Sequence, residues 1–182
     1  FVDDAAETIV DRVESAGAAG QFRHRVEMEL NVEELLRTTL EYVLERVGVT
    51  NAAVLLPSSS GDWAVGAFVN ADMPGESADE TLEDLAESMP VALAGETVAM
   101  RLTGNAEIEA AIGQETAAWL GTRTLIAVPC DNKADRMAIL IAFRDEVTPY
   151  SDDDLDDMRT IEKVFTAQLA KVVRVHNRTS GE

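Results

Sequence analysis

The pattern of apolar and polar positions is most regular in the C-terminal third of the chain. Two apolar runs, residues 124–130 and 136–143, flank a short polar stretch. Such runs, joined by a few polar residues, are typical of an antiparallel hairpin buried on both faces. Pro149 then ends the second strand, and Ser151 is a suitable N-cap for a helix that begins with aspartates. The pattern therefore predicts a hairpin followed directly by a helix.

That final helix carries one continuous apolar stripe at three- and four-residue spacing, so one side of it is expected to pack on the domain. The stripe consists of Leu155, Met158, Ile161, Phe165, Leu169 and Val172. A second long helix is predicted over residues 22–47. Asn31 begins a capping-box pattern within it, and Gly48 follows it as a helix terminator.

The rest of the chain supplies further strands and helices. A first helix is predicted over residues 3–16, with the glycines that follow as a hinge or link. The order of elements predicts a single, largely antiparallel α+β sheet of about five to six strands with helices on both faces. The middle elements are a hairpin of strands 52–57 and 63–70, a helix 79–94 with a kink or break at Pro90, a strand 97–102 and a helix 106–120.

The expected domain organisation is simple, because no internal repeat or low-complexity linker divides the chain. We expect an N-terminal helix and linker over residues 1–21, one domain over residues 22–178 and a disordered tail over residues 179–182. The chain starts at Phe1 instead of Met, so it is interpreted as a piece of a longer protein.

Charge and composition restrict the partners. The net charge is −19 and the isoelectric point is near 4.3, so the surface repels phosphate backbones and nucleic-acid binding is not expected. The acidity is interpreted as an aid to solubility or an adaptation to the host cytoplasm. No apolar run approaches the roughly 20 residues that span a bilayer, so no membrane partner is expected. A single cysteine excludes an internal disulfide and fits a cytoplasmic location.

The same pattern resembles the GAF domain, a small-molecule sensor and dimerisation fold related to the PAS domain. The resemblance extends over residues 30–175 and implies a profilin-like sheet whose long N- and C-terminal helices pack together. Similar domains occur in bacterial histidine kinases, phosphodiesterases, transcriptional regulators and phytochromes. The matching segments are residues 35–43, 52–56, 125–130, 138–143 and 149–155.

Few residues could carry chemistry. In photoreceptors of the family a cysteine holds a linear tetrapyrrole and is typically followed by His, whereas Asp131 follows Cys130 here. Thiol exchange would need further cysteines, so Cys130 is interpreted as structural. His24 and His176 both lie among arginines on predicted helices and are interpreted as solvated. We therefore predict no metal and no cofactor.

No enzymatic activity is expected either. The acidic run over residues 152–157 lacks the glycine of a calcium loop and leads straight into the apolar stripe, so it is interpreted as helix N-terminal charge. No nucleophile, base and orienting group converge in the sequence. The prediction is a regulatory or sensory domain that is not an enzyme.

The resemblance implies a ligand pocket between one sheet face and the helices in the middle of the chain. By position, its candidate lining residues are Phe68, Asn70, Met100, Trp119, Leu125 and Cys130. The alternative is that these side chains simply pack in the core. In that case the domain would be a ligand-free module for dimerisation or protein interaction.

A homodimer is the expected assembly. Some apolar positions on the two long helices exceed what the sheet can cover, and pairing two subunits would bury them. The candidate interface residues are Phe22, Val26, Val172 and Val175. The alternative is that the N-terminal helix folds back and covers them within one chain. The predicted mechanism is a ligand or partner that changes the packing of the central helices and shifts the terminal helices.

Overall fold

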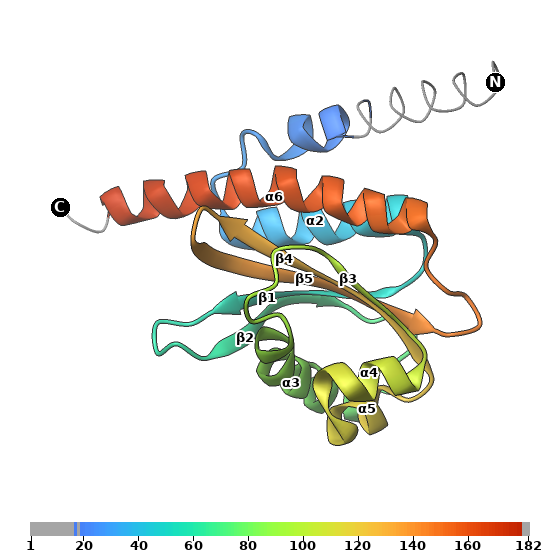
Figure 1. Ribbon diagram of the computed structural model, residues 1–182. Coiled ribbons are helices and arrows are strands. Elements are labelled where there is room, and N and C mark those ends of the chain that lie inside the picture. The colour runs from blue at the N-terminus through green and yellow to red at the C-terminus, as the bar shows by residue number, and fades with distance from the viewer. Residues whose placement is uncertain (1–16, 18, 180–182) are drawn as a thin grey trace, which may run out of the picture.

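The computed structural model describes residue 17 and residues 19–179 (Figure 1). The helix predicted over residues 3–16 therefore lies outside the described residues. The same is true of residues 180–182 of the predicted tail.

The centre of the molecule is one antiparallel sheet in the strand order β2-β1-β5-β4-β3. The predicted single sheet with helices on both faces is confirmed. Its strands are β1 (Asn51–Pro57), β2 (Trp63–Val69), β3 (Met100–Thr103), β4 (Arg123–Asn132) and β5 (Asp135–Asp145).

The predicted two-face burial of the C-terminal hairpin is confirmed. Strands β4 and β5 pair along almost their whole length, with Leu125 opposite Phe143 and Cys130 opposite Ala138. Both strands are buried at every position through their central parts. Because β1 pairs with the other side of β5, β5 lies at the middle of the sheet.

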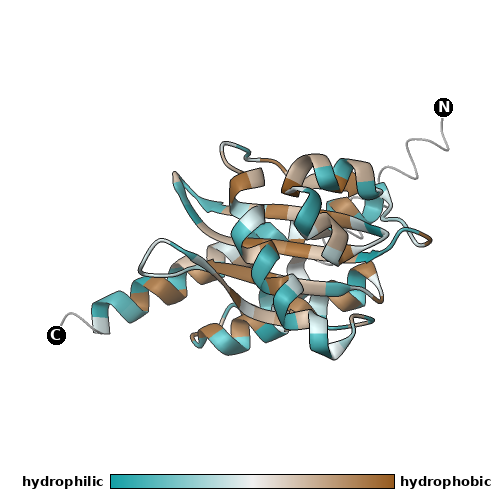
Figure 2. Ribbon diagram, turned by 90° about the horizontal axis from the view of Figure 1, so that it is seen from below, coloured by the Kyte–Doolittle hydropathy of each residue, from teal (hydrophilic) through white to brown (hydrophobic). Residues whose placement is uncertain are grey.

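Two helix layers cover the sheet (Figure 1). The helices α2 (Val32–Val47) and α6 (Asp152–Thr179) lie side by side on one face. The other face is covered by α3 (Gly75–Ala92), α4 (Asn105–Ile112) and α5 (Gln114–Leu120). Seen from the α3 side, the ribbon of the strands is largely hydrophobic, while hydrophilic and hydrophobic positions alternate on the helices (Figure 2). Each layer thus buries one apolar helix side against the sheet, and two cores result.

The helix predicted over residues 22–47 is two helices. Residues 19–26 are helical, the chain then turns, and α2 begins at Val32. Asn31 is the N-cap of α2, because its side chain accepts a hydrogen bond from the amide of Glu34 at 3.2 Å. Glu29 in turn accepts from the amide of Asn31. At the other end Gly48 follows α2 with a φ of 88°, as its predicted role as terminator requires.

Other element boundaries differ from the predicted ones. Helix α3 continues through Pro90 instead of breaking there, because proline removes one donor but the buried side of the helix holds it on the sheet. The helix predicted over residues 106–120 is split into α4 and α5 by Gly113, whose φ is 89°. Ser151 caps α6 as predicted: it accepts from the amide of Asp154, whose carboxylate accepts from the amide of Ser151.

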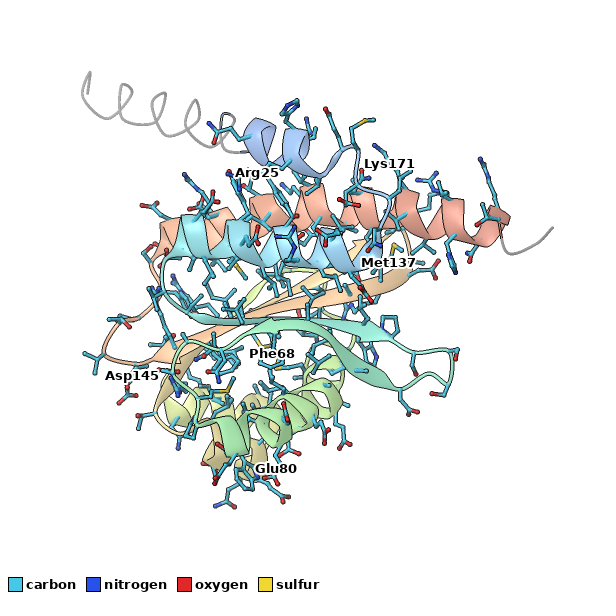
Figure 3. All side chains as sticks on the ribbon, turned by 180° about the vertical axis from the view of Figure 1, so that it is seen from behind. Arg25, Phe68, Glu80, Met137, Asp145 and Lys171 are labelled. Atoms are coloured by element: carbon cyan, nitrogen blue, oxygen red, sulfur yellow. The ribbon has the colours of Figure 1, made fainter. Side chains whose placement is uncertain are left out.

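The helical segment 19–26 covers the outer side of the α2–α6 pair. The Phe22 ring stacks on Tyr42 at 4.7 Å between centroids, and Arg25 forms an ion pair with Glu45 at 2.8 Å. Figure 3 shows Arg25 over this helix layer. The connection to α2 is fixed as well, because Gln168 of α6 donates to the carbonyl of Glu29 at 2.7 Å.

This covering corrects the basis of the predicted dimer interface. Phe22, Val26 and Val172 were expected to be exposed in a single chain, but all three are buried in it. The reason is that the segment 19–26, most of which was predicted as the start of the second long helix, turns back and packs on the α2–α6 pair. Only Val175 remains partly exposed, at 44%.

The Phe22–Tyr42 stack should be a major source of stability for this covering segment. Replacing a buried Phe by Ala costs about 3–5 kcal/mol, so we expect Phe22→Ala to lower the free energy of unfolding by an amount in this range. Urea denaturation followed by circular dichroism measures it. Val147→Ala, at an exposed position after β5, is the control and should change little. Equal effects of the two variants would contradict the described packing.

Candidate functional site

The sheet face under α3, α4 and α5 is the candidate site, because the resemblance places a ligand there. In this chain the space is filled by apolar side chains. The largest fully buried ones are Phe143, Leu55, Leu85, Met89, Leu93, Ile108, Leu125 and Ile139. Among the described residues, every buried side-chain nitrogen or oxygen has a hydrogen-bond partner. This layer is therefore packed with apolar side chains and offers a ligand no unsatisfied buried polar anchor among the described residues.

Hydrogen bonds from one arginine fix the C-terminal end of helix α3 in place. Arg136 on β5 donates to the carbonyl of Leu93 at 2.7 Å and to the carbonyl of Glu96. Asp131 accepts from the same guanidinium at 2.8 Å, so the arginine is fixed on both sides. Its contacts hold the turn after α3 against the β4–β5 hairpin, and movement of that end of α3 requires breaking them.

The six predicted lining residues do not converge on one pocket. Leu125 is fully buried on the α3 side, and Met100 packs at the rim of the same core. Phe68 lies on this side too (Figure 3), but 42% of it is exposed, and Trp119 is 49% exposed on α5. Asn70 points elsewhere: its side chain closes the loop before α3 by pairing with the backbone of Met73.

Cys130 lies on the opposite face of the sheet, in the core under α2 and α6. The alternation of side chains along β4 puts Leu125 and Cys130, five residues apart, on different faces. Burial, together with the nearby Glu162 carboxylate, raises the pKa of the Cys130 thiol far above its ordinary value. Its sulfur lies 3.6 Å from the carbonyl of Val128. A thiol held neutral in this way is a poor nucleophile.

The burial of Cys130 predicts its reactivity. In the native protein at pH 8 we expect an aromatic disulfide reagent to modify no thiol within minutes, because access and the raised pKa both suppress the thiolate. In denaturant the same reagent should report one thiol per chain, since this is the only cysteine. Rapid modification of the folded protein would show that Cys130 is accessible.

One end of the sheet carries a polar network that sequence reasoning missed. Asn51, at the start of β1, donates to the Asp72 carboxylate at 2.7 Å and to the carbonyl of Phe143 at 3.1 Å. The side-chain oxygen of Asn51 accepts from the backbone amides of Ala71 and Asp72. Arg123, at the start of β4, donates to the other Asp72 oxygen at 2.6 Å. Asn51 and Asp72 thus bind the loop before α3 to the end of the sheet where β1 and β4 begin and β5 ends.

The same network reaches the helix pair through Arg144. This guanidinium donates to the carbonyl of Val47 at the end of α2 and to the Asp154 carboxylate at the start of α6. It also lies 4.2 Å from the centroid of the Tyr150 ring. The Tyr150 hydroxyl is 2.6 Å from the Thr50 hydroxyl, which also contacts the carbonyl of Phe143 at 3.1 Å. Phe143 therefore joins the two halves of the network through one carbonyl oxygen.

Two shifted pKa values reflect this arrangement. Burial would raise the pKa of Asp72, but hydrogen bonds from Arg123 and Asn51 outweigh it and lower the pKa below its ordinary value. Burial raises the pKa of Tyr150, so its hydroxyl stays protonated. The network is held by a charged carboxylate at one end and a neutral phenol at the other.

The remaining hollows are open grooves at the surface. One, of about 530 Å³, lies beside the network and includes Asn51, Asp72 and Arg144, whose polar atoms are already hydrogen-bonded within the chain. Another, of about 570 Å³, lies between the β1–β2 hairpin and α3. In the described part of the chain, no three His, Cys, Asp or Glu side chains are grouped to hold a metal ion.

Comparison with known proteins adds to this geometry. No family model matches the sequence, and no curated protein matches it either. Solved structures do match. The GAF domain of a phosphoenolpyruvate-protein phosphotransferase from Acinetobacter is 13% identical, with a TM-score of 0.68 over 88% of this chain and 95% of that one.

Two further matches come from signalling proteins. A GAF domain/HD domain protein from Geobacter sulfurreducens is 13% identical, with a TM-score of 0.64 over 80% of this chain and 94% of that one. The GAF domain of a two-component sensor histidine kinase from Bacillus halodurans is 12% identical, with a TM-score of 0.59 over 82% and 99%. This chain has the GAF fold. The GAF-like architecture expected from the sequence is confirmed.

Within this GAF fold, the described helices include none that is both long enough and apolar enough to cross a bilayer. The pocket residues that the resemblance implies include both core residues and surface residues. The polar network connects the loop before α3 with the α2–α6 pair across one end of the sheet.

The Asp72 interactions predict a pH-dependent stability. Because the folded-state pKa is lowered, the carboxylate stabilises the fold above the ordinary Asp pKa of about 3.9, and this contribution is lost as the pH falls through the lowered pKa. We therefore expect Asp72→Asn to reduce the melting temperature at pH 7 and to differ less from wild type near pH 3. Asp135→Asn, at an exposed hairpin position, is the matched control. A deficit that persists undiminished at low pH would contradict the assignment.

Proposed function

We propose that this chain is a regulatory GAF domain of a bacterial signalling protein, cytoplasmic and not an enzyme, that acts as a homodimer through its α2–α6 helix layer. Its core is filled, and its input is a change in protein contacts. The observation that carries this proposal is the apolar packing of the α3 layer, in which all buried polar side-chain atoms are already paired. A bound effector would have to displace this packing.

The signalling relatives by fold support the regulatory part. GAF domains of a sensor histidine kinase and of a phosphotransferase protein share the architecture over most of this chain. The polar network supports a mechanism, since Asn51 and Arg144 connect the α3 layer to the ends of both α2 and α6. A partner that binds one arrangement of these two layers more tightly than another would shift the population toward the tighter-binding arrangement.

The homodimer is proposed because apolar side chains of the helix layer remain exposed beside the covering segment 19–26. The turn after residues 19–26 carries Met28 and Leu30 with their side chains largely in solvent, and Val175 continues the apolar side of α6. Met28 and Leu30 flank Glu29, whose carbonyl Gln168 of α6 holds, and Val175 lies on α6, so all three belong to the helix layer. Burying such apolar surface against the same surface of a second copy is the usual reason for a two-fold interface.

The filled core is tested with small molecules. Native mass spectrometry of the purified protein should show the mass of the polypeptide alone. Differential scanning fluorimetry with cyclic nucleotides, haem and biliverdin should give no concentration-dependent rise in melting temperature. A bound mass that survives purification, or a saturable stabilisation by any of these compounds, would replace the filled-core proposal with a small-molecule sensor.

The dimer surface is tested with a charge at its centre. We expect Leu30→Glu together with Val175→Glu to raise the dissociation constant of the dimer by about tenfold or more. The reason is that each new carboxylate would be buried in the interface without a partner. Sedimentation velocity at micromolar concentrations measures this dissociation constant. The control is Val91→Glu, another exposed valine, on α3. A wild-type protein that is monomeric at these concentrations would refute the homodimer.

A further inference from the structure

Strand β2 forms one outer edge of the sheet and carries little of the usual protection of an edge. It pairs with β1 on one side, and no other described strand pairs with it. Its seven residues include no charged residue and no proline. A bulge where Gly66 interrupts the register is its only edge-blunting feature. Such an edge has free backbone donors and acceptors ready to pair with another strand.

A largely apolar groove lies at the start of this edge, beside Trp63. It lies between the β1–β2 hairpin and the C-terminal part of α3 and has a volume of about 570 Å³. Trp63 forms its strand side, while Ala86, Pro90 and Val91 form its helix side. Val91 is 76% exposed, so an apolar side chain faces solvent on the helix side of the groove. Along the same face of β2, Phe68 provides a further exposed aromatic surface.

The charge around the groove has one sign. Asp62 and Glu87 lie on its lining. More broadly, residues 47–100, which include β1, β2 and α3, contain nine acidic residues and no Lys, Arg or His. The fifteen Lys and Arg residues of the chain all lie outside this stretch. The charged residues of β1, β2, α3 and the loops between them are therefore all negative, which favours a cationic partner.

We propose that the edge of β2 and its groove bind an extended, cationic peptide segment of a partner protein. The segment adds to β2 as a sixth strand, places an apolar side chain between Trp63 and Val91, and brings Lys or Arg side chains close to Asp62 and Glu87. In strand addition of this kind, backbone hydrogen bonds give affinity and alternate side chains give specificity. A second copy of this chain fits poorly here, because its own β2–α3 surface is equally negative.

The test uses an acetylated and amidated peptide of alternating lysine and valine, as long as β2. The protein carries Trp119→Phe, so that Trp63 is its only tryptophan. We expect the peptide to shift the Trp63 emission saturably and to slow hydrogen exchange of the β2 amides. Raising the salt from about 0.05 M to about 0.5 M should weaken binding, since the Debye length shortens severalfold. A peptide of alternating glutamate and valine should not bind.

Three comparisons make the proposal falsifiable. Glu87→Lys should weaken binding by about tenfold, whereas Glu109→Lys, which changes the net charge equally but lies on α4, should not. Val91→Ser should weaken binding without altering the melting temperature. A peptide methylated at alternate backbone nitrogens should fail to bind. Equal losses for both lysine variants, or undiminished binding of the methylated peptide, would overturn the proposal.

Self-association through β2 would overturn it as well. It would appear as protection of the β2 amides that rises with protein concentration in the absence of peptide. This surface is distinct from the α2–α6 layer, so a monomeric protein that still binds the peptide would refute only the homodimer.

Discussion

Burial of the β4–β5 hairpin on both faces is the constraint from which the rest of the structure follows. Strands with apolar side chains on both sides need a cover above and below, and their backbone groups must be paired along both edges. Strands β1 and β3 provide the pairing. The α2–α6 pair and the α3–α5 layer provide the two covers, so every element of the fold has a place because of this hairpin.

The polar network has the complementary role of fixing where the two covers meet the sheet. Apolar packing alone allows a helix to slide, because dispersion contacts are not directional. The guanidinium of Arg144 and the amide of Asn51 are directional: they choose particular carbonyls and carboxylates at the ends of α2, α6 and the loop before α3. The network also explains why these polar groups can be buried, since each finds a partner.

The fold could be predicted from the sequence because its signals are local and periodic. The stripe from Leu155 to Val172 and the apolar runs of the hairpin carry their own secondary structure, as do the caps Asn31 and Ser151. The network could not be predicted, because Asn51, Asp72 and Arg144 are far apart in sequence and ordinary in their surroundings. The burial of Phe22 could not be predicted either. It depends on a turn after residue 26, and the apolar pattern of the sequence continues through that turn without a break.

Arg144 also fixes the position of the first turn of α6 relative to the sheet. Helix α6 has 28 residues, which at 1.5 Å per residue gives a length of roughly 42 Å. Because its first turn is tied to β5 and to the end of α2, a change in its packing tilts the helix instead of translating it. A tilt of about 5° moves the far end by roughly 3–4 Å over a helix of that length. If the packing of α6 changed near the sheet, the displacement at Thr179, the last residue of the helix, would therefore be larger than that near its start.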